Sequence, residues 1–166
     1  MPAAGRLAVL RHAKATHEPG FRDIDRPLTR RGQRDAAAAG RFLRARGIVP
    51  DLVLCSSSAR TTQTWDYLTA GGDMAAAQVS YEPRIYDAGT AALLGIIGET
   101  PADVGTLMIV GHNPAAHELV LMLTGERDLT FPTCALAVIE LEGTWSQAAA
   151  QSGHLSVLWT PKRGAS

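Results

Sequence analysis

The chain has 166 residues, of which 46% are hydrophobic and 19% are charged, a composition that excludes a disordered chain and predicts a single domain over 1–166 with a frayed tail at 161–166. Sixteen Lys and Arg residues balance sixteen Asp and Glu residues, so no global charge draws the chain to nucleic acid or to an anionic membrane. No apolar run is long enough for a signal peptide or a membrane span, and we expect a cytoplasmic protein.

The first predicted element is a strand at 7–10, a short apolar run without the polar alternation of a half-exposed strand. A long connection follows at 13–29, and we expect it to form the rim of a pocket because long loops in α/β folds are often functional. Thr29 can then cap a helix that runs to about Gly47, where the glycine supplies a stop.

A second apolar run at 51–55 predicts another strand that is covered on both faces. A helix is predicted to start after Ser57 or Ser58 and to continue through 65–68. A third helix is indicated at 91–97.

The next strand is predicted at 106–110, again from a continuous apolar run. The helix after it has clear start and stop signals. Asn113 is expected as its cap, Pro114 as its first helical residue and Gly125 as its stop.

Two further apolar runs, 134–141 and 155–159, are separated by a turn-rich segment and predict edge strands, at least one of them antiparallel. Strands that alternate with helices elsewhere predict a mainly parallel sheet. The expected fold class is therefore α/β, a three-layer α/β/α sandwich. Cys55 and Cys134 lack metal-ligand or redox spacing, and we expect both to be reduced and buried.

Reactive side chains follow three of the predicted strands. Arg11 and His12 come directly after the first strand, 56–60 after the second, and Gly111 and His112 after the strand at 106–110. Ligands of open α/β sheets bind outside the carboxyl ends of the strands, where helix N-termini favour anions. Two arginines and two histidines at that edge predict a phosphate site.

The residue types at this edge also suggest a reaction. Two guanidinium groups can hold phosphoryl oxygens bidentately and neutralise them. A neutral imidazole nitrogen can attack phosphorus, and a second histidine can donate a hydrogen bond to the oxygens of the transition state. This chemistry requires no metal and no cofactor, and we expect none.

At these positions the chain resembles the histidine phosphatase superfamily, specifically its SixA-like phosphohistidine phosphatase branch. Four motifs carry the resemblance: LRHAK at 10–14, RPLT at 26–29 followed by Gly32, SSSAR at 56–60, and VGHNP at 110–114. The resemblance spans residues 7 to about 124, and the last forty residues add little to it. It implies a phosphoglycerate mutase-like fold.

Carried over by position, the resemblance implies that His12 is the phosphorylated nucleophile and that Arg11 and Arg60 bind phosphate. It also implies that His112 is the second histidine of the pocket. Lys14 is a further candidate phosphate ligand, favoured by its place two residues after the nucleophile, and the alternative is that it points into solvent. His17, His117 and His154 lack partners at ligand spacing and are expected to be structural or exposed.

Two positions depart from the family pattern. Ala13 follows the nucleophile where glycine is commonest, and the acidic proton donor of many members has no clear counterpart. Asp87 is the best positional candidate for that donor, Glu82 is second, and Asp23 or Asp25 in the long first loop are further alternatives. A weak donor favours a phosphohistidine substrate, whose imidazole leaves more readily than an alkoxide.

Eight of the sixteen basic residues lie within 22–46, and a solvated helix face is the simplest interpretation. The alternative is that part of this charge docks an acidic protein partner, since local charge can guide association. Exchange of Arg31 and Arg34 for Glu would then weaken turnover of a protein substrate only.

The function that these residues favour is hydrolysis of phosphohistidine in a phosphorylated protein, because the chain is too short for a lid domain that would enclose a small molecule. A small-molecule phosphomonoesterase is the first alternative. A catalytically weak phosphate- or phosphoprotein-binding module is the second, and a mutase is less favoured because it must shield its intermediate from water. The oligomeric state and the physiological substrate stay open.

Overall fold

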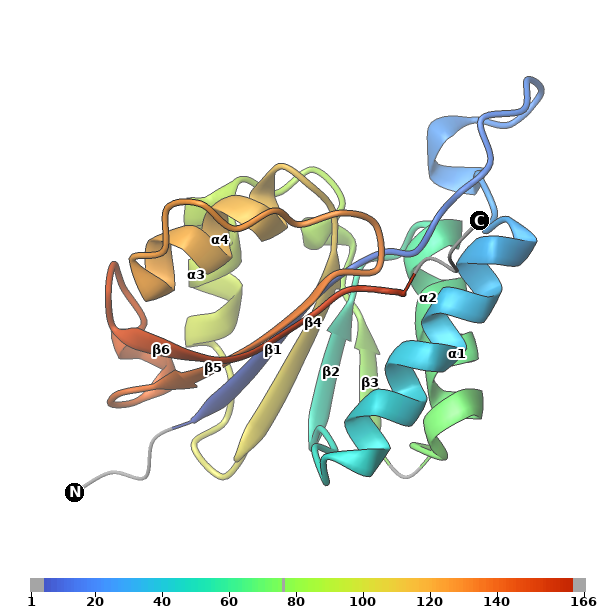
Figure 1. Ribbon diagram of the computed structural model, residues 1–166. Coiled ribbons are helices and arrows are strands. Elements are labelled where there is room, and N and C mark those ends of the chain that lie inside the picture. The colour runs from blue at the N-terminus through green and yellow to red at the C-terminus, as the bar shows by residue number, and fades with distance from the viewer. Residues whose placement is uncertain (1–4, 76, 163–166) are drawn as a thin grey trace.

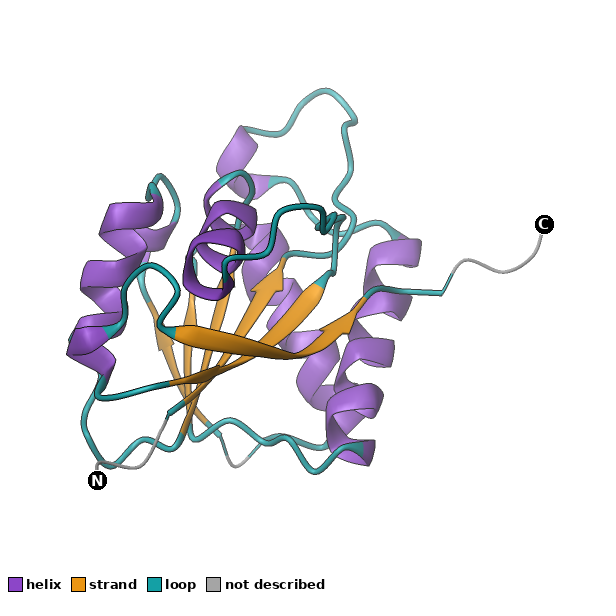
Figure 2. Ribbon diagram, turned by 60° about the vertical axis from the view of Figure 1, so that its left-hand side comes forward, coloured by secondary structure: helices purple, strands orange, loops and turns teal. Residues whose placement is uncertain are grey.

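The computed structural model describes residues 5–75 and 77–162, which form a six-stranded sheet between two layers of helices (Figures 1 and 2). The strand order is β3-β2-β4-β1-β5-β6. The strands are β1 (Arg6–Arg11), β2 (Leu52–Cys55), β3 (Gln78–Tyr81), β4 (Thr106–Gly111), β5 (Leu136–Leu141) and β6 (Gly153–Trp159). The helices are α1 (Arg30–Ala45), α2 (Ala59–Gly72), α3 (Thr90–Gly98) and α4 (Ala115–Thr124), with short 3₁₀ turns at Asp23–Asp25, Pro83–Ile85 and Trp145–Gln147.

The sheet is parallel from β3 to β1, while β5 pairs antiparallel with β1 and β6 pairs antiparallel with β5. The fold class is therefore the one expected from the sequence, with both antiparallel strands on one side of the sheet. The parallel strands need helical crossovers, and Figure 1 shows α1 and α2 on one face of the sheet and α3 and α4 on the other.

The central strand β1 shows why this sheet has two covered faces. Leu7 and Val9 join the hydrophobic cluster under α3 and α4, whereas Ala8 and Leu10 join the cluster under α1 and α2. All four side chains are fully buried, as expected for a continuous apolar run with period-two geometry.

The predicted helix starts are mostly confirmed. Thr29 caps α1 by accepting a hydrogen bond from the Gly32 amide, and Ser58 caps α2 by accepting one from the Thr61 amide. The start of α4 requires a correction: the helix begins at Ala115, and Pro114 occupies the capping position. Asn113 still satisfies a helix amide, because its side-chain oxygen accepts a hydrogen bond from the amide of His117.

Strand β3 was not expected from the sequence. It is an exposed edge strand, and Gln78, Ser80 and Tyr81 present no continuous apolar face that would reveal it. Cys55 and Cys134 are both buried and form no disulfide, as predicted. In 5–75 and 77–162, no helix combines the length and the apolar character that crossing a bilayer requires.

Candidate active site

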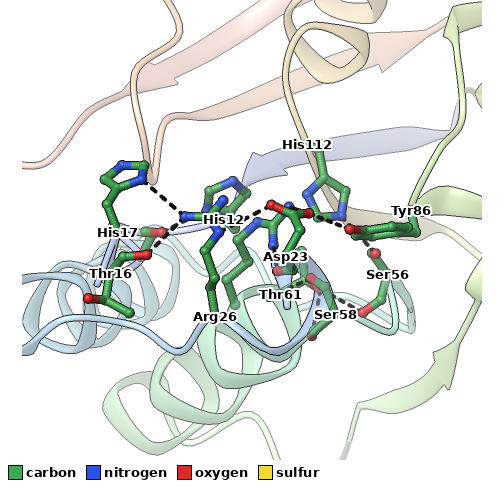
Figure 3. A network of polar contacts seen from close by, with 12 residues as sticks. His12, Thr16, His17, Asp23, Arg26, Ser56, Ser58, Thr61, Tyr86 and His112 are labelled. Atoms are coloured by element: carbon green, nitrogen blue, oxygen red, sulfur yellow. Dashed lines mark hydrogen bonds and ion pairs between the residues drawn. The ribbon is translucent and has the colours of Figure 1, made fainter. Parts of the chain in front are cut away.

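The four residues that the sequence places at strand ends meet in one pocket beyond the carboxyl ends of β1, β2 and β4. The pairing register explains the meeting: Arg11 lies opposite Gly111, so the next residues, His12 and His112, emerge side by side. Their ring centroids are 5.4 Å apart, and Figure 3 shows both rings beside the same polar network.

The pocket has a volume of about 260 Å³. It is lined by Arg11, His12, Lys14, Ala15, His17, Arg26, Arg60, His112, Asn113 and Thr133. A larger cavity of about 580 Å³ lies near the amino ends of β1 and β4, but none of the candidate catalytic residues lines it. Reactive side chains identify the smaller pocket as the candidate active site.

His12 is oriented by the backbone. Its Nδ1 lies 2.8 Å from the carbonyl oxygen of Ala13. Because a carbonyl oxygen can only accept a hydrogen bond, Nδ1 carries the proton and is the donor. Burial lowers the pKa of His12 to about 3, and the positive charges of Arg60 and Arg11 add to the effect. His12 is therefore neutral at physiological pH, with an unprotonated Nε2.

His112 is neutral for similar reasons, since burial and then the charge of Arg60 lower its pKa to about 4. Its Nε2 lies 2.8 Å from the hydroxyl oxygen of Ser56. Its Nδ1 is buried and has no hydrogen-bond partner among the described residues. Nε2 of the ring is therefore hydrogen-bonded within the protein, and Nδ1 can bond a ligand.

Each pocket arginine is tethered by a backbone carbonyl. Arg11 Nη1 donates to the carbonyl of Phe131 over 3.2 Å, and Arg60 Nη1 donates to the carbonyl of Asp23 over 2.7 Å. In both arginines Nε is buried and has no partner in the described part of the chain. Two guanidinium groups are thus fixed in position while each keeps a free donor.

Asn113 also contacts the backbone carbonyl that holds Arg11. Its side-chain amide donates to the carbonyl of Phe131 over 2.9 Å. The carbonyl of Phe131 therefore contacts both Arg11 and Asn113. The resemblance drew little on this last part of the chain. No sequence pattern predicts the contribution of Phe131 to the site, because any residue type can supply a backbone carbonyl.

The long first connection folds over the pocket, as predicted for its rim. Ala15 pairs with Leu28 in an antiparallel bridge, which brings Arg26 to the pocket wall. Arg26 Nη1 donates to the carbonyl of Thr16 over 3.0 Å. Arg26 belongs to the RPLT motif and to the basic stretch at 22–46, and its place in that motif is the only sequence signal for a role in the pocket.

The four candidate proton donors lie in different surroundings. Asp23 contacts Arg60, with 3.0 Å between its carboxylate oxygen and Nη2. Asp25 is paired with Arg22 outside the pocket. None of the four candidates lines the pocket.

Asp87, the first choice from the sequence, is exposed, and its carboxylate forms no hydrogen bond or ion pair with another residue of 5–75 or 77–162. Glu82 is paired with Arg84 over 3.0 Å. Asp23 is the candidate that the structure brings to a pocket arginine. Hydrogen bonds from Tyr86 and then from Arg60 lower the pKa of Asp23 to about 2, so it is ionised.

The remaining histidines and Lys14 can also be placed. Lys14 lines the pocket, and so does His17, whose Nδ1 lies 3.4 Å from Arg26 Nη1. His117 is structural, with Nε2 2.9 Å from the carbonyl of Leu129. The described residues contain no group of three or more His, Cys, Asp or Glu side chains that could hold a metal ion.

Comparisons with known proteins agree with this geometry. The family model of the histidine phosphatase superfamily (branch 1) matches residues 7–104. An uncharacterized protein of Mycobacterium tuberculosis is 37% identical over 147 residues, which cover 82% of this chain and 90% of that protein.

Two solved structures share the fold. A protein provisionally assigned as the phosphohistidine phosphatase SixA of Nakamurella multipartitia is 32% identical, with a TM-score of 0.85 over 97% of this chain and 99% of that chain. The protein histidine phosphatase SixA in complex with tungstate is 22% identical, with a TM-score of 0.76 over 94% of this chain and 97% of that chain. The chain belongs to the histidine phosphatase superfamily, branch 1.

Proposed function

We propose that this protein is a phosphatase that hydrolyses phosphohistidine in a protein through a covalent intermediate on His12. The observation that carries the proposal is a group of unsatisfied nitrogens. Five buried side-chain polar atoms of the described residues lack a partner, and three of them are Arg11 Nε, Arg60 Nε and His112 Nδ1. An unmade hydrogen bond at a buried polar atom costs about 1–3 kcal/mol, and a phosphoryl group would supply the missing acceptors.

His12 Nε2 is the nucleophile in this proposal. Its lone pair attacks phosphorus, a P–N bond forms to His12, and the bond to the leaving group breaks. Arg11 and Arg60 neutralise the phosphoryl oxygens. Water then attacks phosphorus, and the P–N bond to His12 breaks with its electron pair returning to Nε2. Inorganic phosphate, which keeps the oxygen and the protons of the water, is released, and the neutral imidazole is regenerated.

His112 serves as a hydrogen-bond donor to the phosphoryl group. When the Ser56 hydroxyl donates to Nε2, neutral His112 carries its proton on Nδ1, the nitrogen that has no protein partner. That N–H can donate to a phosphoryl oxygen and stabilise the charge that develops in the transition state.

Two features favour a phosphorylated protein over a small molecule. The pocket volume of about 260 Å³ is below the range of about 300–1,000 Å³ that is usual for sites enclosing a drug-sized ligand. It suits a phosphoryl group whose carrier stays outside. Asp23, the carboxylate that contacts the pocket residue Arg60, is ionised, so a leaving group that departs without strong acid assistance is favoured.

The resemblance to SixA proteins supports the same substrate class, and tungstate is a phosphate-like oxyanion bound by one of them. The test is a substrate panel: a phosphohistidine protein, an aryl phosphate, sugar phosphates and nucleotides. We expect the highest kcat/KM for the phosphohistidine protein. Preference for a sugar phosphate or a nucleotide would instead establish the small-molecule phosphomonoesterase, and phosphate binding without turnover of any substrate would establish the binding module.

A further inference from the structure

Asp23 does not line the pocket itself but contacts two of the arginines that do, Arg60 and Arg26. Its Oδ2 accepts hydrogen bonds from Arg60 Nη2 over 3.0 Å and from the Tyr86 hydroxyl. Its Oδ1 accepts one from Arg26 Nε over 3.2 Å. Figure 3 shows Asp23 between Arg26 and Tyr86, near His112. Because Arg60 and Arg26 both line the pocket, a negative charge is placed against the groups that would hold a phosphate.

The backbone of Asp23 already tethers Arg60. Its carbonyl oxygen accepts from Arg60 Nη1 over 2.7 Å, a contact that does not depend on the side chain. The Asp23 side chain is 57% exposed, and ion pairs in such positions contribute little to stability. The carboxylate is therefore not needed to attach the loop to Arg60, and its main effect is the negative charge that it brings to the arginines.

A pocket lined by arginines binds any phosphate, including the inorganic phosphate that the reaction releases. A carboxylate beside those arginines opposes a dianion and offers them a competing partner. A phosphoryl group on a protein differs from free phosphate because its carrier makes additional contacts outside the pocket. Weakening the interaction with the phosphate itself thus selects for the carrier and speeds release of the product.

We propose that Asp23 is a specificity-determining residue whose carboxylate lowers the affinity of the pocket for free inorganic phosphate. The proposal rests on the phosphatase function proposed above. Arg60 and Arg26 keep their places through backbone contacts with Asp23 and Thr16, while the Asp23 side chain reduces the net positive charge that they present.

The test compares inorganic phosphate binding by wild type, Asp23→Asn and Asp23→Ala in isothermal titration calorimetry. Asn keeps the size of the side chain and one acceptor oxygen but removes the charge. We expect phosphate to bind at least about tenfold more tightly to both variants, because they remove a negative charge that contacts Arg60 and Arg26 and that repels a dianion most strongly at low ionic strength. The inhibition constant of phosphate in aryl phosphate turnover should fall in parallel.

Asp25→Asn is the matched control, because Asp25 lies on the same 3₁₀ turn but pairs with exposed Arg22. Its phosphate affinity should stay within about twofold of wild type, because the Asp25 carboxylate contacts neither Arg60 nor Arg26 and its charge is balanced by Arg22. The gain in Asp23→Asn should also shrink as salt is raised, a dependence that a purely structural role would not produce.

Weaker or unchanged phosphate binding in Asp23→Asn overturns the inference, since it would make the side chain a tether for Arg60. Should Asp23→Ala fail to fold, Asp23→Asn decides alone. If wild type turns over its substrates while no variant gains affinity, only the inference fails. If no variant binds phosphate and wild type has no phosphatase activity, the proposed function fails with it.

Discussion

The two pocket histidines are neutral because of where they lie. His12 is 9% exposed, and burial is the largest cause of its lowered pKa. The Ala13 carbonyl assigns the proton to Nδ1, and the register between β1 and β4 brings His112 beside it. A nucleophilic nitrogen without a proton is therefore maintained by backbone contacts and by burial.

Lowered histidine pKa values predict how stability depends on pH. In the unfolded chain both histidines take up protons below pH 6.5, whereas in the native state they stay neutral down to about 4 for His112 and about 3 for His12. The contribution of the two neutral histidines to the free energy of unfolding is thus fully present above pH 6.5 and is lost as the pH falls. We expect the free energy of unfolding to fall from pH 6.5 down to about pH 4 for His112 and about pH 3 for His12, by up to about 1.4 kcal/mol per pH unit for each histidine.

Urea denaturation across this pH range measures the slope. His12→Gln and His112→Gln should each flatten it, because glutamine takes up no proton. A slope that is the same in both variants as in wild type would show that these histidines titrate normally in the folded protein.

Ser56 should affect catalysis through His112. Ser56→Ala removes the hydroxyl 2.8 Å from His112 Nε2, and loss of about 1 kcal/mol of hydrogen bonding should lower kcat up to about tenfold with little change in KM. Ser57→Ala is the control, because Ser57 has no side-chain hydrogen bond within the described residues. Equal effects of the two substitutions on kcat would argue against this role of Ser56.

Sequence reasoning reached the four central side chains because each stands directly after a strand or in the first turn of a helix. The sequence alone favours Asp87 over Asp23 as the acid, because nothing in it shows that the long first loop folds back onto Arg60. It also assigned no role to Phe131, whose contribution is a carbonyl oxygen. Contacts made by loop backbone carry no signature in residue types.

At the scale of elements, α1 and the first loop must approach closely to form the pocket rim. A Cβ atom added to Gly32 would lie 2.2 Å from the carbonyl oxygen of Lys14. Thr29, which caps α1, also donates its amide to the carbonyl of Lys14 over 2.9 Å. The glycine of the RPLT motif region is therefore required for packing.

Gly32→Ala should destabilise the protein by about 1–3 kcal/mol, although alanine favours helices, because backbone atoms cannot yield easily. Gly95→Ala is the matched control: Gly95 lies within α3 with nothing within 4 Å of the added Cβ. It should stabilise the protein by about 0.5–1 kcal/mol. Urea denaturation measures both, and a stabilising Gly32→Ala would refute the close contact.

The exposed basic side chains of α1 form a stripe. Arg30, Arg34, Arg41 and Arg44 fall within about 80° of one another on a helix with 3.6 residues per turn, and none forms an ion pair with a described residue. Arg31 instead lies 3.9 Å from Asp35. In Figure 1 the start of α1 lies at the pocket end of the molecule and its C-terminal end lies away from it.

Exchange of Arg30 and Arg34 together for Glu should lower kcat/KM for an acidic phosphohistidine protein by about tenfold and leave aryl phosphate turnover unchanged. The same exchange of Arg41 and Arg44, farther from the pocket, is the control and should have a smaller effect. If the first pair lowers turnover of both substrates alike, α1 does not dock the protein carrier.

Sequence patterns predicted the buried strands and the capped helices, because continuous apolar runs and Thr29 or Ser58 caps leave clear signals. They did not predict β3, whose residues are exposed at the edge of the sheet, and they placed the start of α4 one residue early. An edge strand needs no apolar pattern, and the first residues of a helix are decided by local backbone geometry.

Across the whole molecule, the parallel sheet is what assembles the site. Strands β1, β2 and β4 end at one edge, and His12, Ser56 and His112 follow them at adjacent positions. The helices on both faces bury the sheet, and the loop that carries Asp23 and Arg26 closes over its edge. Catalytic side chains that are spread over about 100 residues of sequence thus meet in one small pocket.

The central claim, that His12 carries the phosphoryl group, is tested most directly by trapping the phosphoenzyme. Radiolabelled phosphohistidine protein is mixed with wild type, His12→Ala and the exposed-strand control His154→Ala, and the denatured enzyme is mapped for acid-labile label. We predict label on the peptide containing His12 in wild type and His154→Ala, and neither label nor turnover in His12→Ala. Undiminished turnover by His12→Ala would contradict the account.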